Sequence, residues 1–402
     1  MYVRRWAVAA LALLAIIAIV AAAVWRVAGG SSGSVRSAAG AASSPARDLH
    51  AKAARRARGP FLSPGQLAAQ RVIYAYAGLH PPASLLAALR AGEGAGIILF
   101  KANLGSFGQI RAVVDQLGRA EAASGVHAPL LILTDQEGGE VRRLPGSPDL
   151  SEREIGESAN PVALAARAGT GAGRTLAEAG LNVNLSPVLD VARRRGNFID
   201  QFQRSYGGRA RAVARLGAAF IAAQQRIGIA ATAKHFPGLG AAAPGQDTDS
   251  RPVILPVPPR QLRAVDEAPY RSAIAAGVKL VMTSWAVYPA LDPRLPAGLS
   301  PRVIQGELRD RLGYRGVTVT DALGAAALRR FGTLAERGVM AAKAGADLII
   351  CSAVDGTDSP AGGLAVLKAI ASAIARGQLN RTAAEQAAAR VMALRRSLRE
   401  TA

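Results

Sequence analysis

The chain has 402 residues and a formal net charge of +21, from 49 basic and 28 acidic residues. Half of the residues are hydrophobic and only 19% are charged, which excludes a disordered protein and is ample for a sizeable core. A single cysteine excludes an intramolecular disulfide framework, and four histidines leave too few ligands for a Cys/His zinc site.

The positive charge does not indicate nucleic-acid binding. Arginine supplies most of it in a chain that is also rich in alanine and glycine, a bias typical of a GC-rich genome. Aromatic residues make up 4% of the chain, so rings that could stack on bases are scarce. We therefore predict no nucleic-acid partner, no metal and no cofactor.

The N-terminus predicts export. Arg4 and Arg5 precede 19 uncharged residues, 7–25. This run is longer than the ~7–15 residues of a usual secretory core and close to the ~20 of a spanning helix, so residues 1–28 are either a signal-anchor, which the length favours, or a cleaved signal peptide. The positive head stays in the cytoplasm and the body lies outside it, anchored to the membrane or secreted.

Residues 29–60 read as a flexible linker rich in Gly, Ser and Ala. It ends in a basic patch of Lys52, Arg55, Arg56 and Arg58. Such a patch either lies on anionic lipid headgroups or simply belongs to a solvated tether.

Residues 61–402 alternate short apolar strands with helical stretches. The apolar runs are continuous rather than alternating, which is typical of strands covered on both faces. The predicted strands are 72–76, 96–100, 129–134, 181–186, 229–233, 278–283, 316–320 and 346–351, and the predicted helices include 161–179, 210–227, 259–276 and 334–344. Eight such units predict an α/β fold, a single-domain (β/α)₈ TIM-type barrel that we expect to be monomeric.

Two local patterns complete this interpretation. Thr382 followed by Glu385 fits a capping box at the start of the last helix. The glycines at 169, 171 and 173 could suggest a dinucleotide-binding loop, but they lie inside a predicted helix that precedes a strand, which is the wrong context.

Charged and polar residues follow several predicted strands, at the end of a barrel where active sites lie. They are found in Thr134-Asp135-Gln136-Glu137 and the following Arg143, in Asn184 and Asp190, in Arg204, in Lys234-His235 and in Thr320-Asp321. Alone, Asp321 could equally cap a helix, and Lys234 and His235 could form structural ion pairs. Together, carboxylates and cations at one mouth suit a neutral polyhydroxylated ligand, because they accept from and donate to sugar hydroxyls. A carboxylate nucleophile with a nearby proton donor is what a retaining glycosidase requires.

These motifs resemble glycoside hydrolase family 3, and within it the single-barrel bacterial β-N-acetylglucosaminidases (β-N-acetylhexosaminidases). The resemblance covers residues 65–400. It rests on Lys234-His235-Phe236-Pro237-Gly238 and on segments 135–143, 181–190, 204–207, 282–292 and 320–323, all in the order of that family. By this resemblance Asp321 is the nucleophile, and the subsite for the non-reducing sugar is lined by Asp135, Arg143, Arg204, Lys234 and His235.

The sequence departs from the family pattern around the proton donor. That branch follows Lys-His-Phe-Pro-Gly with His-Gly and later carries an Asp-Ser-His triplet whose His is the acid/base. Here His235 is present, but Leu239 replaces the His that follows Gly238. The triplet reads Asp249-Ser250-Arg251, and Trp285 stands where a His is common. Arginine does not release its proton at ordinary pH, so Asp249 or Asp247 is the expected acid/base.

We therefore expect an exported glycoside hydrolase that removes terminal β-linked sugars by a retaining mechanism, with N-acetylglucosamine, for example of cell-wall fragments, as the implied sugar. The alternative is a catalytically weakened or inactive sugar-binding barrel tethered to the membrane. A barrel with aldolase or phosphate-ester chemistry is disfavoured, since no Schiff-base lysine or phosphate loop is apparent.

The first testable prediction concerns location. Fractionation of cells should recover the body outside the cytoplasm, because a charged head precedes 19 uncharged residues and a linker. A mature chain that begins after residue ~25 would identify a cleaved signal. Full-length protein that is soluble in the cytoplasm would contradict export.

Overall fold

The computed structural model describes residues 62–353 and 359–399. The predicted membrane segment and linker, residues 1–60, lie outside the described residues. Within the described ranges no helix is both long enough and apolar enough to cross a membrane.

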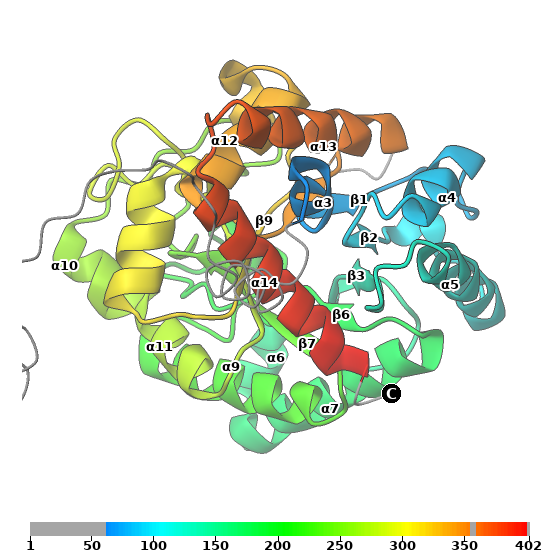
Figure 1. Ribbon diagram of the computed structural model, residues 1–402. Coiled ribbons are helices and arrows are strands. Elements are labelled where there is room, and N and C mark those ends of the chain that lie inside the picture. The colour runs from blue at the N-terminus through cyan, green and yellow to red at the C-terminus, as the bar shows by residue number, and fades with distance from the viewer. Residues whose placement is uncertain (1–61, 354–358, 400–402) are drawn as a thin grey trace, which may run out of the picture. The chain divides into compact units, whose positions relative to one another are not determined.

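Eight parallel strands form a barrel, which confirms the predicted fold (Figure 1). The strands are β1 (Val72–Tyr74), β2 (Gly96–Ile98), β3 (Leu131–Thr134), β6 (Val183–Asn184), β7 (Ala230–Phe236), β8 (Leu280–Thr283), β9 (Val317–Thr320) and β10 (Ile349–Cys351). They follow one another around the ring in chain order, and β10 pairs with β1. A parallel bridge between Val319 and Leu348 closes the ring between β9 and β10. All eight predicted strands are present, most of them shorter than predicted.

The helices enclose the barrel: most of them cover the outer faces of its strands, and the last one crosses one end of it (Figure 1). They are α3 (Pro64–Ala69), α4 (Ala83–Arg90), α5 (Phe107–Ala122), α6 (Glu152–Glu157), α7 (Pro161–Ala179), α8 (Phe198–Gln201), α9 (Ala210–Gln225), α10 (Pro259–Gln261), α11 (Ala268–Ala275), α12 (Leu334–Ala344), α13 (Pro360–Ala375) and α14 (Arg381–Arg399). Short 3₁₀ helices span Lys101–Asn103, Ala297–Leu299 and Ala326–Phe331, and π-helical turns span Leu262–Asp266 and Arg302–Arg311.

Two of the predicted helices, α7 and α12, have the predicted bounds. The prediction of one helix over 259–276 is wrong, because a π-helical turn separates α10 from α11. Pro269 lies in the first turn of α11 and has no N–H to offer the preceding turn, so a continuous helix would lose a hydrogen bond there.

The glycine run at 169–173 lies inside α7, as predicted. A Cβ at Gly169 would lie 2.3 Å from the carbonyl oxygen of Phe220 in α9, and one at Gly173 would lie 3.0 Å from Ile227. The glycines therefore allow α7 and α9 to pack closely, and the run has a structural explanation.

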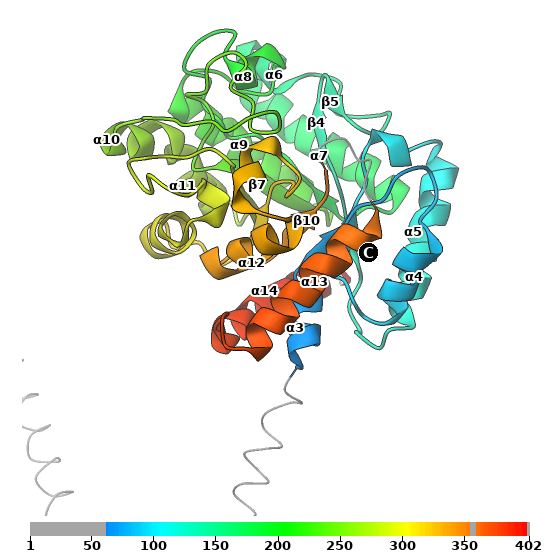
Figure 2. The same cartoon turned by 90° about the horizontal axis from the view of Figure 1, so that it is seen from above.

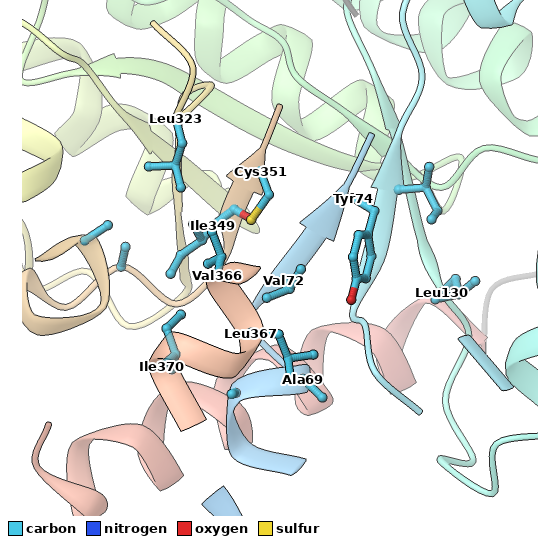
Figure 3. Close-up of a cluster of buried hydrophobic side chains, with 14 of the residues drawn as sticks. Ala69, Val72, Tyr74, Leu130, Leu323, Ile349, Cys351, Val366, Leu367 and Ile370 are labelled. Atoms are coloured by element: carbon cyan, nitrogen blue, oxygen red, sulfur yellow. The ribbon is translucent and has the colours of Figure 1, made fainter. Parts of the chain in front are cut away.

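The core has two parts that meet at the strands. Outside the barrel, Val366, Leu367 and Ile370 of α13 point toward Val72 and Ile349 (Figure 3). Inside it, apolar side chains of the strands form a separate cluster, and α14 contributes three members to that cluster, namely Val391, Leu394 and Leu398. Figure 2 shows α14 at the end of the barrel opposite α6, α8 and the hairpin of β4 (Gln136–Gly138) and β5 (Val141–Arg142). Helix α14 therefore seals one end of the barrel, and the other end remains for the site.

The predicted capping box at Thr382 is wrong. Helix α14 begins at Arg381, and the N–H of Ala383 donates instead to Oδ1 of Asn380 (2.9 Å), while Glu385 pairs with Arg381. Asn380 precedes the helix and so occupies the position from which a side chain can cap it.

A buried arginine fixes α14 to the rest of the barrel. Arg395 is fully buried, and its guanidinium donates to Oε1 of Glu121 (2.7 Å) and to the carbonyl oxygens of Ala128 (2.8 Å) and Pro129 (2.9 Å). These contacts join the last helix to α5 and to the segment that enters β3. The charge is buried, but carboxylate and carbonyl oxygens compensate it.

The second prediction tests this contact. Arg395→Met should lower the free energy of unfolding by about 3 kcal/mol, because it leaves the Glu121 carboxylate buried with a lost partner. Urea or thermal unfolding measures the change. The exposed neighbour Arg396→Met is the matched control and should change stability by less than about 0.5 kcal/mol. Equal effects of both variants would contradict the assigned role.

Candidate active site

One cavity of about 150 Å³ lies at the mouth of the barrel where the strands end. Its lining includes all eight residues that the sequence suggested, namely Asp135, Arg143, Arg204, Lys234, His235, Asp247, Asp249 and Asp321. Apolar side chains of Ile98, Leu185, Met282 and Ile350 also line it. The fold thus brings together residues that lie up to 186 positions apart in the sequence.

Lys234 lies at the centre of a buried network of charges. Its Nζ is 2.6 Å from Oδ1 of Asp135 and 2.8 Å from Oε1 of Glu137, and its side chain is only 2% exposed. Burial alone would lower the pKa of Lys234, but the two carboxylates raise it above its ordinary value. The ammonium group is therefore held charged inside the cavity wall.

Arg204 completes the network by binding Glu137 through two bonds. Its Nε and Nη2 each lie 2.9 Å from a different carboxylate oxygen of Glu137. Burial would raise the pKa of Glu137, but the charges of Arg204 and Lys234 outweigh it and lower the pKa to about 2. Glu137 thus remains ionised and holds both cations in place.

Asp135 and Arg143 lie on either side of a small antiparallel hairpin, β4 (Gln136–Gly138) and β5 (Val141–Arg142), which follows β3. The pKa of Asp135 is lowered, because Lys234 and Arg143 more than offset the effect of burial. Arg143 Nε is 3.9 Å from Oδ2 of Asp135 and, among the described contacts, makes no hydrogen bond although it is buried. Arg143 lines the cavity, and the exposed part of its side chain can donate to a ligand there.

A second buried pair fixes the ring of His235. Its Nδ1 lies 2.7 Å from Oδ2 of Asp190, while Oδ1 of Asp190 accepts from the backbone N–H of Leu239 (2.6 Å). Asp190 is fully buried. Because Nδ1 faces this carboxylate, Nε2 is the ring nitrogen left for the cavity.

Lys234 and His235 both line the cavity although they are neighbours in β7, where successive side chains would normally alternate. The pairing of β7 with β8 changes register between Ala233 and Phe236. An irregularity of this kind redirects side chains at the end of a strand. Strand β7 also continues three residues past its predicted end at 233.

Asp321 directly follows β9 and is half-buried. Its Oδ1 accepts the N–H of Ala322 (2.7 Å), and the next helical turn begins only at Ala326. Its contact is therefore with its own neighbour and not with the start of a helix, which disfavours the capping alternative.

The loop 240–251 lines the cavity through residues 247–249 and is bound to the segment that follows Asp321. The N–H of Ala326 donates to the carbonyl oxygen of Asp249 (2.9 Å), and that of Ala327 donates to Thr248 (3.1 Å). The N–H of Asp249 donates to Oδ1 of Asp247 (2.9 Å). Both candidate acid/base residues thus belong to a hydrogen-bonded turn next to Asp321.

Asp249 differs from the other carboxyl groups of the cavity. Its side chain is exposed to water at the mouth, although many protein atoms lie around it, and no cation forms a salt bridge with it among the described residues. Partial burial, followed by the charges of Asp321 and Asp247, raises the pKa of Asp249 to about 7. The side chain of Arg251 lies over Gly245, with Nη2 3.1 Å from the position of a Cβ there. The charges that act most strongly on Asp249 are those of Asp321 and Asp247, followed by Arg204 and Asp135, and Arg251 is not among them.

Glu137 and Asp190 were quoted within sequence motifs but were not predicted as site residues. Glu137 is two residues after Asp135, and in an extended chain this spacing puts both side chains on one face, which was a usable signal. Asp190 is 45 residues from His235 in the sequence, and nothing local indicates their contact. Among the described residues, no group of three or more His, Cys, Asp or Glu side chains could hold a metal ion.

Comparison with known proteins agrees with this geometry. The family model described as "Glycosyl hydrolase family 3 N terminal domain" matches residues 65–394. A protein of Arthroderma benhamiae named "Uncharacterized secreted glycosyl hydrolase" is 45% identical over 334 residues, which cover 82% of this chain and 93% of that protein. A β-hexosaminidase of Stenotrophomonas maltophilia is 36% identical over 268 residues, 64% of this chain and 75% of that protein.

Solved structures agree as well. A family 3 β-N-acetylglucosaminidase from Paenibacillus superposes with a TM-score of 0.78 at 36% identity, covering 85% of this chain, which spans 64% of that longer chain. A β-N-acetylhexosaminidase from Beutenbergia cavernae superposes with a TM-score of 0.73 at 33% identity, covering 83% of this chain and 98% of that one. The chain therefore belongs to glycosyl hydrolase family 3, on the β-N-acetylhexosaminidase branch of that family.

Proposed function

We propose that this protein is an exported, retaining β-N-acetylhexosaminidase with Asp321 as the nucleophile and Asp249 as the general acid/base. The observation that carries the proposal is the meeting, in one cavity, of Asp321, a carboxyl group of raised pKa and a set of paired charges suited to hydroxyls. The names of the similar proteins support the sugar class, and the word "secreted" in one of them supports export.

In the first step, a carboxylate oxygen of Asp321 attacks the anomeric carbon, and the bond to the leaving oxygen breaks. Asp249 gives its proton to that oxygen, which leaves as an alcohol. The pKa of about 7 makes Asp249 a suitable acid, because a sizeable fraction is protonated at neutral pH.

In the second step, Asp249 is a carboxylate and takes a proton from water as the water attacks the glycosyl ester of Asp321. The ester bond breaks, Asp321 is regenerated and the sugar is released with its original configuration. Asp135, Lys234, His235, Arg143 and Arg204 would hold the hydroxyls of the sugar through both steps.

The experiment that tests the proposal is the hydrolysis of a panel of chromogenic β-glycosides by the full chain. The N-acetylglucosaminide should be the preferred substrate. Binding of N-acetylglucosamine without turnover of any glycoside would instead support the inactive sugar-binding barrel.

The third prediction concerns Asp321. Asp321→Asn should lower kcat/KM on the order of 10³-fold or more, because the amide is a poor nucleophile and no ester forms. Steady-state kinetics measures the loss, and a thermal melt checks that the fold is retained. A mechanism-based fluorosugar should label Asp321 in the wild-type protein, and labelling of another carboxylate would refute the assignment.

The fourth prediction concerns Asp249. Asp249→Ala should barely lower kcat/KM for an aryl glycoside with an activated phenol, which leaves without a proton, but should lower kcat/KM for an alkyl glycoside on the order of 10²-fold or more. The ratio of the two rates is the readout. Asp247→Asn keeps an oxygen for the N–H of Asp249 but removes a charge that raises the pKa of Asp249, so it should preserve the wild-type ratio when both rates are measured at a pH well below 7. A changed ratio in that variant alone would make Asp247 the acid.

The fifth prediction is the pH dependence. Because Asp249 must carry a proton in the first step and its pKa is about 7, kcat/KM should fall as the pH rises through about 7. Measurement with the alkyl glycoside between pH 5 and 9 should give this limb. Activity that stays constant up to pH 9 would be inconsistent with Asp249 as the acid.

A further inference from the structure

We infer that Trp285 is a positioning residue that orients the nucleophile Asp321 through the peptide of Ala322. The inference rests on the proposed role of Asp321 and extends it to a residue of the neighbouring strand. Trp285 is 1% exposed, so it does not act as a surface contact, and it is absent from the lining of the cavity.

The register of the barrel brings Trp285 to the nucleophile. Strands β8 and β9 are parallel, and Thr283 pairs with Thr320, the last residue of β9. Two residues further along each chain, Trp285 therefore stands beside Ala322. The indole Nε1–H donates to the carbonyl oxygen of Ala322 (2.9 Å).

Ala322 transmits this contact to the reacting carboxylate. Its N–H donates to Oδ1 of Asp321 (2.7 Å), and its carbonyl oxygen accepts from the indole N–H. Both backbone polar groups of Ala322 are therefore hydrogen-bonded. On the other side, Leu323 and Gly324 donate to the carbonyls of Ile350 in β10 and of Ser352 just after it. The nucleophile segment is thus held from β10 through its backbone and from the side of β8 through the indole.

The indole ring of Trp285 packs closely against Gly298. A Cβ at Gly298 would lie 2.4 Å from Cζ3 of Trp285, so only glycine leaves room for the ring at this distance. The N–H of Gly298 donates to the carbonyl of Ser284, which fixes the glycine beside the ring. This close packing leaves little room for the indole ring, and hence its N–H, to move.

Two variants separate the N–H from the bulk of the ring. Trp285→Phe fills much of the space of the indole ring but has no N–H to donate to Ala322. Trp285→His has less bulk, but its Nε2 occupies the same position in the five-membered ring as the indole Nε1. Gly298→Ala is a third variant that displaces the intact indole.

The experiment measures kcat, KM and labelling by the fluorosugar for these variants of the full chain. Trp285→Phe and Gly298→Ala should lower kcat and the labelling rate by about 10-fold to 100-fold, with KM within about twofold, because small misplacement of a reacting group is costly. Trp285→His should recover most of the loss. The loss should be equal for activated and poor leaving groups, unlike that of Asp249→Ala.

A purely structural role predicts a different result. Losses that follow the melting temperature, with His no better than Phe, would overturn the inference, as would wild-type rates for Trp285→Phe. If the wild-type protein hydrolyses no glycoside, the proposed function fails and this inference fails with it. If the wild type is active and Trp285→Phe is unaffected, only this inference fails.

Discussion

The interaction on which the site depends is the burial of the Lys234 ammonium between the carboxylates of Asp135 and Glu137. A lysine with 2% exposure would lose its proton if it stood alone, and two carboxylates so close together would repel each other without it. Asp135 and Glu137 belong to the hairpin that follows β3, Lys234 belongs to β7, and Arg204 adds the loop before α9. These ion pairs therefore fix the positions of separate segments relative to one another. A sugar that enters the cavity would find the binding side chains already in place.

The same cavity gives its carboxyl groups opposite proton affinities. Asp135 and Glu137 contact cations, and their pKa values are lowered. Asp249 has two carboxylates as its nearest charged neighbours, and its pKa is raised. Environments that push apart the pKa values of similar groups are typical of acid/base catalysts. In a chain that has Arg251 in place of the usual histidine, this contrast is what makes a carboxyl group a credible proton donor.

The sequence predicted the barrel well because its strands are short apolar runs that both faces of the sheet cover. It predicted that these polar side chains would meet in one cavity, because they follow those runs at one end. It could not predict the partners of those residues. The contact of Asp190 with His235 depends on the neighbouring positions of β6 and β7, and the proton affinity of Asp249 depends on which charges surround it in space. The cap of α14 was misassigned because Asn380 and Thr382 both fit a helix start, and only the structure shows which oxygen meets the free N–H.

The position of α14 has a consequence for how the protein is made. The barrel closes by pairing β1 with β10, residues almost 280 positions apart, and its interior is sealed by apolar side chains as far along the chain as Leu398. During synthesis, neither event is possible until nearly the whole chain has left the ribosome, and contacts so distant in sequence form slowly. A protein of this design cannot close its barrel while most of the chain is still being made. A chain whose barrel has not yet closed can pass through a narrow channel and fold on the other side.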